Sequence, residues 1–168
     1  MGFNANLQSQ ITNLLKQNHL YLATAESCTG GLLGHLITNT PGASAYYLGG
    51  QIAYTNQAKM RWLGVRTETL ARCGAVSRET VLEMAQGIRC AFGGEMGEEK
   101  IISLSISGIA GPDGGTDAKP VGTVWIGLAS PWGDEASEFH FNGDRLAIKM
   151  QSAEQTLKML LDWLKHHI

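Results

Sequence analysis

LYLATAESCTGGLLGHLI, residues 20–37, describes a strand that turns directly into a helix. Its first six residues, 20–25, are apolar and form a short run, which is typical of a buried strand. The apolar residues around and after the glycine pair predict a helix that begins near Cys28 or Thr29 and runs to about Thr38. A strand followed at once by a helix is a building unit of α/β proteins, so this stretch decides the fold class.

The rest of the chain continues the alternation of helices and strands. Apolar residues at helical spacing predict helices over 5–18 and 146–164, and Ser77 is a favourable N-cap for a third helix. The other predicted elements are strands at 46–55, 101–107, 121–130 and 135–141, a short helix at 56–65, and a glycine-rich loop at 108–120. Two late strands follow each other without a helix. We therefore expect a mixed sheet with helices on both faces, a three-layer α/β/α sandwich, in a single domain over residues 1–168.

Composition argues against several classes of protein. The 168 residues carry a formal net charge of −2 and contain no basic run, which argues against a nucleic-acid partner. No apolar stretch approaches the roughly 20 residues that span a bilayer, and the N-terminus has no signal-peptide pattern, so we expect a cytoplasmic protein without a membrane partner. Three cysteines without CxxC spacing and five scattered histidines predict no disulfide framework, no metal site and no cofactor.

ESCTGG, residues 26–31, supports two interpretations. Ser27 or Thr29 can simply cap the helix, because a side-chain oxygen accepts an N–H that has no helical partner. The glycine pair needs a further explanation, since glycine costs about 1 kcal/mol against alanine inside a helix. Two adjacent glycines suggest that a ligand approaches the backbone, and N–H groups at a helix start suit a phosphate, a carboxylate or an oxyanion. Ser27 is then a candidate nucleophile.

A serine nucleophile needs a base, because its hydroxyl group reacts weakly at neutral pH. No histidine is an obvious partner, but AYTNQAK, residues 53–59, places Tyr54 near the end of a strand and Lys59 one turn into the next helix. If both side chains point into one cleft, burial would lower the pKa of the lysine. Alternatively, Lys59 is a solvated helix residue and Tyr54 a core aromatic, and spacing alone favours this alternative. A third segment, SGIAGPDGG (107–115), follows a strand and is typical of a ligand loop.

Together these segments resemble the CinA family, specifically its C-terminal domain, a nicotinamide-nucleotide amidohydrolase. The segments that carry the resemblance are AESCTGGLL (25–33), PGASAYYLGGQIAYTNQAK (41–59), LGV (63–65), GAVS (74–77), SGIAGPDGGTDAKPVGTVWIGLA (107–129) and FNGDR (141–145). They follow the family order over most of the chain. The full-length family form has an additional N-terminal pyrophosphatase-like domain, so the resemblance implies the stand-alone form.

The resemblance implies hydrolysis of the carboxamide of nicotinamide mononucleotide to nicotinic acid mononucleotide and ammonia, a step in pyridine nucleotide recycling, without a metal. It implies Ser27 as the nucleophile, activated through Tyr54 and Lys59, with backbone N–H groups near Thr29 and Gly30 holding the oxyanion. The candidates for binding the nucleotide are Thr29, Gly30, Gly31, Asn56, Gly108, Ala110 and Gly111, with Arg145 for its phosphate.

Other possibilities stay open at this point. The chain can be a catalytically silent nucleotide-binding or regulatory module of the same fold, or a thiol enzyme that uses Cys28. Arg145 can equally be a solvated cation beside Asp144. Ser107 stands where the family usually has threonine, and Lys149 where many relatives have arginine. We also expect a homodimer or higher homo-oligomer, since the apolar stripe of the last helix can pair with a second chain as well as cover the sheet.

Overall fold

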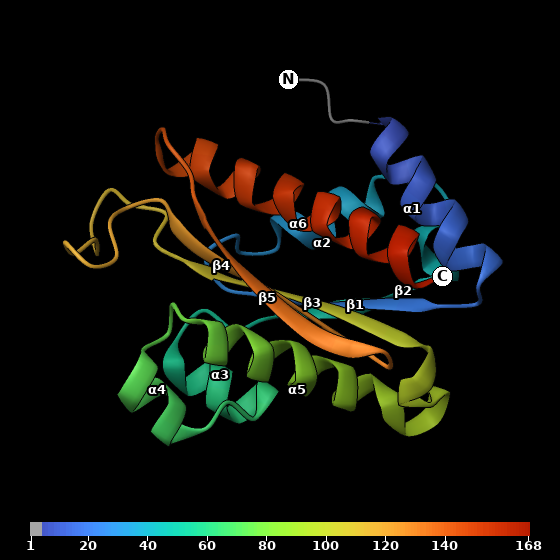
Figure 1. Ribbon diagram of the computed structural model, residues 1–168, viewed down its shortest axis with the longest axis horizontal. Coiled ribbons are helices and arrows are strands. Elements are labelled where there is room, and N and C mark those ends of the chain that lie inside the picture. Colours follow the sequence, from blue (N-terminus) through green and yellow to red (C-terminus); the bar gives the residue numbers. More distant parts are fainter. Residues whose placement is uncertain (1–4) are drawn as a thin grey trace.

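The computed structural model describes residues 5–168 (Figure 1). Residues 1–4, which begin the segment where we expect no signal peptide, lie outside the described residues. In chain order the elements are α1 (Ala5–Gln17), β1 (Tyr21–Glu26), α2 (Leu32–Thr38), β2 (Tyr47–Ile52), α3 (Asn56–Leu63), α4 (Thr67–Cys73), α5 (Arg78–Met96), β3 (Ile101–Gly108), β4 (Thr123–Ser130), β5 (Gly133–His140) and α6 (Arg145–His167), with 3₁₀ turns at Ala43–Ala45 and Glu98–Lys100.

The strands of the described chain form one mixed sheet in the order β2-β1-β3-β4-β5. β1 pairs in parallel with β2 and β3, whereas β4 pairs antiparallel with β3 and β5. Helices connect the parallel strands, because a parallel pair needs a crossover, while a tight turn suffices between β4 and β5. The predicted mixed sheet is confirmed.

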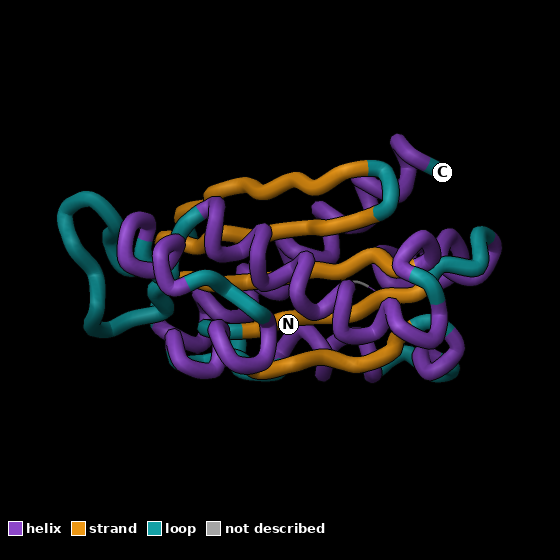
Figure 2. The backbone as a smooth tube through the Cα atoms, turned by 90° about the horizontal axis from the view of Figure 1, so that it is seen from below, coloured by secondary structure: helices purple, strands orange, loops and turns teal. Residues whose placement is uncertain are grey.

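Helices cover both faces of this sheet and give the predicted three-layer sandwich (Figure 1). α1, α2 and α6 lie on one face, and α3, α4 and α5 lie on the other. In Figure 2, which views the molecule from below, helices lie in front of the strands. α6 packs against α1, α2, β3 and β4, so its apolar stripe covers the sheet within the chain.

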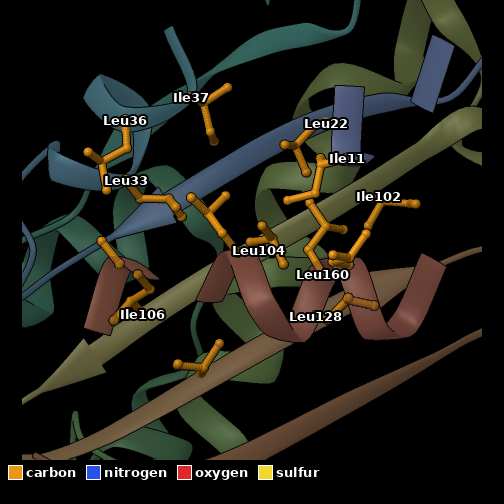
Figure 3. Close-up of a cluster of buried hydrophobic side chains, with 14 of the residues drawn as sticks. Ile11, Leu22, Leu33, Leu36, Ile37, Ile102, Leu104, Ile106, Leu128 and Leu160 are labelled. Atoms are coloured by element: carbon orange, nitrogen blue, oxygen red, sulfur yellow. The ribbon is translucent and has the colours of Figure 1, made fainter. Parts of the chain in front are cut away.

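The larger apolar core lies between the sheet and the layer formed by α1, α2 and α6 (Figure 3). It is built from strand residues that point to this face and from the apolar sides of the three helices. Fully buried members include Leu15, Leu22, Leu33, Leu104, Ile106, Leu128 and Leu160. Each such side chain contributes about 1.5–3 kcal/mol when it leaves water, so this layer fixes the sheet that carries the site.

Serine side chains line the opposite face of β3. Ser103 and Ser105 donate hydrogen bonds of 2.7 and 2.6 Å to the carbonyl oxygens of Ala85 and Val81 in α5. These hydroxyl groups are buried, and the helix carbonyls satisfy them. The alternation of isoleucine or leucine with serine that predicts this strand therefore gives one apolar face and one face that binds a helix.

The carboxyl ends of the three parallel strands meet at one edge of the sheet. Glu26 at the end of β1 is aligned with Ile52 of β2 and Ile106 of β3. The loop 109–122 leaves β3 at this edge and projects beyond the sheet (Figure 2). Ligands of open α/β sheets bind in crevices outside such strand ends, so the edge is the first place to look for a site.

Three local predictions differ from the structure. α2 begins at Leu32, so the glycine pair precedes the helix, and Gly31 occupies the N-cap position with a φ of 96°. α5 runs to Met96, so it continues through the first half of GGEMGEEK, residues 93–100, a segment whose composition predicts an exposed connection. Leu146, which the sequence places in the apolar stripe of the last helix, is 68% exposed, so the buried side of α6 begins further along the helix.

Candidate active site

Ser27 directly follows β1 and meets Lys59 of α3 in a buried contact. The distance between Lys59 Nζ and Ser27 Oγ is 2.8 Å, which is an ordinary hydrogen-bond length. Lys59 is 1% exposed and Ser27 is 7% exposed. Lysine is almost never fully buried unless its charged end has partners. The structure therefore brings together two of the three predicted catalytic residues, and Lys59 is not the solvated helix residue of the alternative interpretation.

The connection from β2 to α3 directs the Lys59 side chain inward. Thr55 caps α3, and its hydroxyl oxygen accepts a 3.1 Å hydrogen bond from the N–H three residues later. This cap fixes the first turn of the helix, and Lys59 lies just beyond it. Lys59 Nζ also donates to the carbonyl oxygens of Ala53 at 2.9 Å and Tyr54 at 3.4 Å. The backbone that leads into the helix thus holds the amine beside Ser27.

Burial lowers the pKa of the Lys59 amine from 10.5 to about 8, because desolvation disfavours the charged ammonium form. At pH 7 about a tenth of the amines are then neutral, against about one in 3,000 for an unperturbed lysine. The two carbonyl oxygens can accept the two N–H bonds of a neutral amine. Its lone pair is then available to the Ser27 hydroxyl, which gives the geometry of a nucleophile and its base.

The Glu26 carboxylate occupies the start of α2. Its oxygens accept hydrogen bonds from the backbone N–H groups of Gly31 at 2.9 Å, Leu33 at 3.1 Å and Gly34 at 2.8 Å. A carboxylate is favourable at this position because the first N–H groups of a helix have no helical partner and carry a partial positive charge. Glu26 therefore already uses the backbone N–H group of Gly31, and the role of Gly31 in binding the nucleotide stays a prediction.

The other N–H groups of the turn divide into two kinds. The Gly30 N–H, one of the predicted oxyanion donors, donates to the Ser27 carbonyl oxygen at 3.1 Å. The N–H groups of Cys28 and Thr29 donate to no backbone carbonyl of the described chain. They follow the serine directly and are the remaining candidates in this turn for holding an oxyanion. The Thr29 side chain is fully buried, and its hydroxyl has no hydrogen-bond partner within residues 5–168.

The Cys28 thiol is an unsuitable nucleophile in this environment. Burial raises the pKa of the Cys28 thiol to about 12, because desolvation disfavours the thiolate. The thiolate is the reactive form of cysteine, so at neutral pH this side chain stays protonated. Cys28 also belongs to the larger apolar core, although it borders the site. These features favour packing over catalysis for Cys28.

The Tyr54 hydroxyl group contacts Arg145, the predicted phosphate ligand. It accepts a 2.6 Å hydrogen bond from Arg145 Nη2, while Arg145 Nη1 donates to the Gly111 carbonyl oxygen at 2.6 Å. Tyr54 is 55% exposed and contacts Lys59 through its backbone carbonyl. The structure therefore does not place the phenol between Ser27 and Lys59, where the sequence prediction had it relay a proton. Arg145 is not a free cation beside Asp144, because it joins Tyr54 to the loop 109–122.

A cavity of about 270 Å³ opens over Ser27 and Lys59. This volume is near the lower end of the about 300–1,000 Å³ that is usual for small-molecule sites. The predicted site residues that line it are Ser27, Tyr54, Lys59, Gly108, Ala110, Gly111 and Arg145. Thr29, Gly30, Gly31 and Asn56 are outside its lining, and Asn56 lies exposed in the first turn of α3.

Sequence reasoning missed several residues that complete this cavity. Ala75 and Val76, from the connection between α4 and α5, line it, as does Asp113 from the loop 109–122. Ser107 lines it too, and its hydroxyl donates a 2.7 Å hydrogen bond to the Ala75 carbonyl oxygen. Their segments, GAVS and SGIAGPDGG, are part of the family resemblance. Periodicity gives no indication that these two segments meet, since they are distant in sequence.

Three further observations bear on the predicted absence of metal, disulfide and membrane segments. Within residues 5–168, no three His, Cys, Asp or Glu side chains are arranged so that they could hold a metal ion. The thiols of Cys28, Cys73 and Cys90 are unlinked. None of the helices between residues 5 and 168 combines the length and the apolar character that crossing a bilayer requires.

Comparisons with known proteins agree with the fold and with the resemblance seen in the sequence. The family model of the CinA C-terminal domain matches residues 4–164. CinA-like proteins of Thermotoga maritima and Geobacter sulfurreducens are 45% and 42% identical to this chain over 95% and 96% of its length, and the chain spans 37% of the length of each. A crystal structure of a CinA superfamily protein from Klebsiella pneumoniae matches 96% of this chain and 97% of its own, with a TM-score of 0.88 and 35% identity. CihA from Agrobacterium tumefaciens matches 98% of this chain and 99% of its own, with a TM-score of 0.86 and 34% identity.

Proposed function

This chain belongs to the CinA C-terminal domain family, and on that premise we propose that it hydrolyses the carboxamide of nicotinamide mononucleotide to nicotinic acid mononucleotide and ammonia. The observation that carries the proposal is the 2.8 Å contact between the buried Lys59 amine and the Ser27 hydroxyl. Acyl transfer from an amide needs an activated nucleophile beside a base, and this pair supplies both in one cavity.

The first half of the reaction forms an acyl-enzyme. The neutral Lys59 amine accepts the proton of the Ser27 hydroxyl while Oγ forms a bond to the amide carbon. The negative charge that develops on the amide oxygen is held by the N–H groups that follow Ser27, and losing one such donor typically costs about 2.7–4 kcal/mol in barrier. The C–N bond then breaks, and the leaving nitrogen takes the proton from the Lys59 ammonium and departs as ammonia.

The second half of the reaction repeats these roles with water. Lys59 is neutral again and accepts a proton from a water molecule, whose oxygen attacks the ester carbon. The bond to Ser27 Oγ breaks, and the serine recovers its proton from Lys59. The product is a carboxylic acid, which releases its proton to solvent and becomes a carboxylate. Ser27 and Lys59 return to their starting state.

Arg145 and Tyr54 are proposed to bind the rest of the nucleotide. Arg145 is the one guanidinium among the residues that line the cavity, and its donors already bind a carbonyl oxygen and a phenol oxygen. A phosphate is a stronger acceptor for this planar group than either oxygen, so it can replace them. Tyr54 accepts from Arg145 and thus keeps its own O–H available to donate to a substrate atom.

The direct test is ammonia release from nicotinamide mononucleotide by purified wild type, Ser27→Ala and Lys59→Met, with circular dichroism to confirm folding. We expect each variant to lose at least about 10³-fold in turnover, because nucleophile and base act as one unit. Lys158→Met is the matched control, since Lys158 is an exposed lysine of α6, and it should keep wild-type turnover. Undiminished turnover by Lys59→Met would show that Lys59 is not the base.

One observation favours a second candidate, a catalytically silent module that binds the same nucleotide. The Tyr54 hydroxyl is bonded to Arg145, so the predicted three-residue relay is not assembled in this conformation. A silent module would bind nicotinamide mononucleotide in calorimetry and release no ammonia at any pH. A homodimer or higher oligomer also stays a proposal, which size-exclusion chromatography with light scattering tests.

A further inference from the structure

We infer that Lys119 is a positioning residue of this site, which fixes the loop 109–122 against the connection between α4 and α5. The two segments form neighbouring parts of the cavity wall beside Ser27 and Lys59. The expected effect on the kinetics rests on the proposed function, whereas the attachment of the loop through Lys119 does not.

The loop 109–122 has few internal supports. Its base is closed where the Gly122 N–H donates to the Ile109 carbonyl oxygen at 2.8 Å. Residues 112–118 are all exposed, and their backbone hydrogen bonds are confined to one turn between Thr116 and Lys119. Lys119 is half-buried, in contrast to the seven residues before it. It is therefore the point at which the outer part of the loop returns to the body of the protein.

The Lys119 ammonium binds two carbonyl oxygens across the gap. Its Nζ donates to the Cys73 carbonyl at 3.0 Å and to the Val76 carbonyl at 2.7 Å, which are 46 and 43 residues away in sequence. Cys73 is the last residue of α4, where carbonyl groups have no helical partner and a cation is favourable. A side chain at Gly74 would begin 3.8 Å from Lys119 Nζ, so the ammonium lies directly on this connection.

The connection itself depends on such side chains for its shape. It has no regular secondary structure, and all four carbonyl oxygens of residues 73–76 accept side-chain hydrogen bonds. The donors are Lys119 for Cys73 and Val76, Ser77 and Thr80 for Gly74, and Ser107 for Ala75. Lys119 is thus the side-chain donor for two of these four carbonyl oxygens. Its removal therefore releases both the loop and the segment that it grips.

Lys119 does not itself line the cavity. It acts through residues that do, namely Val76 on the connection and Gly111 and Asp113 on the loop. A change at Lys119 should therefore alter how well the cavity fits a substrate while the distance between Ser27 and Lys59 stays the same. The expected signature is a higher KM with little change in kcat.

The kinetic arm compares Lys119→Met, Lys119→Arg and the control Lys158→Met on nicotinamide mononucleotide. Methionine keeps the length of the stem and removes the donors, so we expect KM to rise about tenfold or more, since small misplacements of binding groups have large effects. Arginine can still donate to both carbonyls and should restore KM to within about threefold of wild type. An unchanged KM in Lys119→Met, or a loss confined to kcat, overturns the positioning role.

The second arm uses proteolysis by an endoproteinase that cleaves before aspartate, with fragments identified by mass spectrometry. Cleavage before Asp113 and Asp117 should be several-fold faster in Lys119→Met than in wild type and in Lys158→Met, and cleavage before Asp162 should not change. If cleavage before Asp113 and Asp117 is no faster in Lys119→Met than in wild type, Lys119 does not fix the loop. If wild type releases no ammonia, the proposed function fails by itself, and this arm still decides whether Lys119 fixes the loop.

Discussion

Two glycine-rich segments lie at the same edge of the sheet, ESCTGG at residues 26–31 and GIAGPDGG at residues 108–115. Both follow a strand and both look like ligand loops in the sequence. In the first, the N–H groups of both glycines bind within the chain, and Glu26 holds three N–H groups of the helix start. In the second, residues 112–115 are exposed, and Arg145 and Lys119 bind the loop to distant parts of the chain.

The difference lies in where the stabilising partner comes from. Glu26 reaches N–H groups five to eight residues later, so the turn that carries Ser27 is shaped by its own neighbours in sequence. The loop depends on partners 34 to 46 residues away and takes its shape only when the whole sandwich has formed. A nucleophile needs a fixed position, whereas a loop over a cavity must admit a substrate, and the two kinds of support match these two tasks.

The largest effect that separates the two segments should come from Glu26→Gln. The amide keeps the size of the side chain but loses the charge, and its NH₂ group faces N–H donors that need an acceptor. We expect the free energy of unfolding to fall by about 3 kcal/mol, since hydrogen bonds to a charged group are the strong ones and a buried donor loses its partner. Asp117→Asn in the exposed loop is the matched control and should change stability by less than about 0.5 kcal/mol. Urea denaturation measures both, and equal losses would contradict the contrast.

The next effect concerns the pH dependence of turnover. The lowered pKa of about 8 for Lys59 means that the neutral base forms as the pH rises through that value. If chemistry limits kcat/KM, it should increase about 90-fold between pH 6 and pH 9, in proportion to the neutral fraction of the amine. Asp113→Asn, which changes the loop side of the cavity, should not move the midpoint of the pH profile of kcat/KM. A profile that is flat across pH 8 would contradict the assignment of Lys59 as the base.

A smaller effect should distinguish two glycines with similar backbone conformations. Gly31 has a φ of +96°, and a side chain there would begin 3.1 Å from Ile52 Cδ1, whereas Gly114 has a φ of +90° and only an ordinary contact, 3.7 Å from Ile109. The left-handed conformation alone costs about 1–2 kcal/mol for a residue with a side chain. We expect Gly114→Ala to lose about 1 kcal/mol of stability and Gly31→Ala about 2 kcal/mol, because crowding adds to the strain. Similar losses would show that the turn relaxes as easily as the loop.

The sequence predicts the elements of the fold well because each depends on local pattern. The alternation in IISLSIS and the spacing of leucines in α6 identify elements that the structure confirms. The start of α2 was misplaced because Glu26, not a residue of the helix, satisfies the first N–H groups. No periodic pattern in the sequence indicates that a side chain so far before the helix accepts its first N–H groups. The glycines after Glu26 were therefore interpreted as residues that bind a ligand.

The site was predictable to a different degree for each residue. Spacing made it possible for Lys59 to meet Ser27, but spacing alone favoured a solvated lysine, and the family resemblance decided the prediction. The partner of Tyr54 was not predictable, because Arg145 lies 91 residues later in the chain and only the tertiary fold brings them together. Asp113 and Val76 were missed for the same reason. An aspartate or a valine in the sequence does not by itself indicate a site, and only the folded structure shows that these two residues line the cavity.

The smallest effect should come from Cys28→Ser, which tests whether the Ser27 turn holds one nucleophile or two. Serine is close to cysteine in size, and the pKa of about 12 keeps the Cys28 thiol protonated, so we expect kcat/KM to stay within about threefold of wild type. Labelling with iodoacetamide at pH 7 should modify the exposed Cys90 and spare Cys28, since a buried, protonated thiol is unreactive. If Cys28→Ser abolishes ammonia release while Ser27→Ala retains it, the nucleophile is the thiol. The contact between Lys59 and Ser27 would then be structural, and the turn would hold its serine only to fix the backbone around a reactive cysteine.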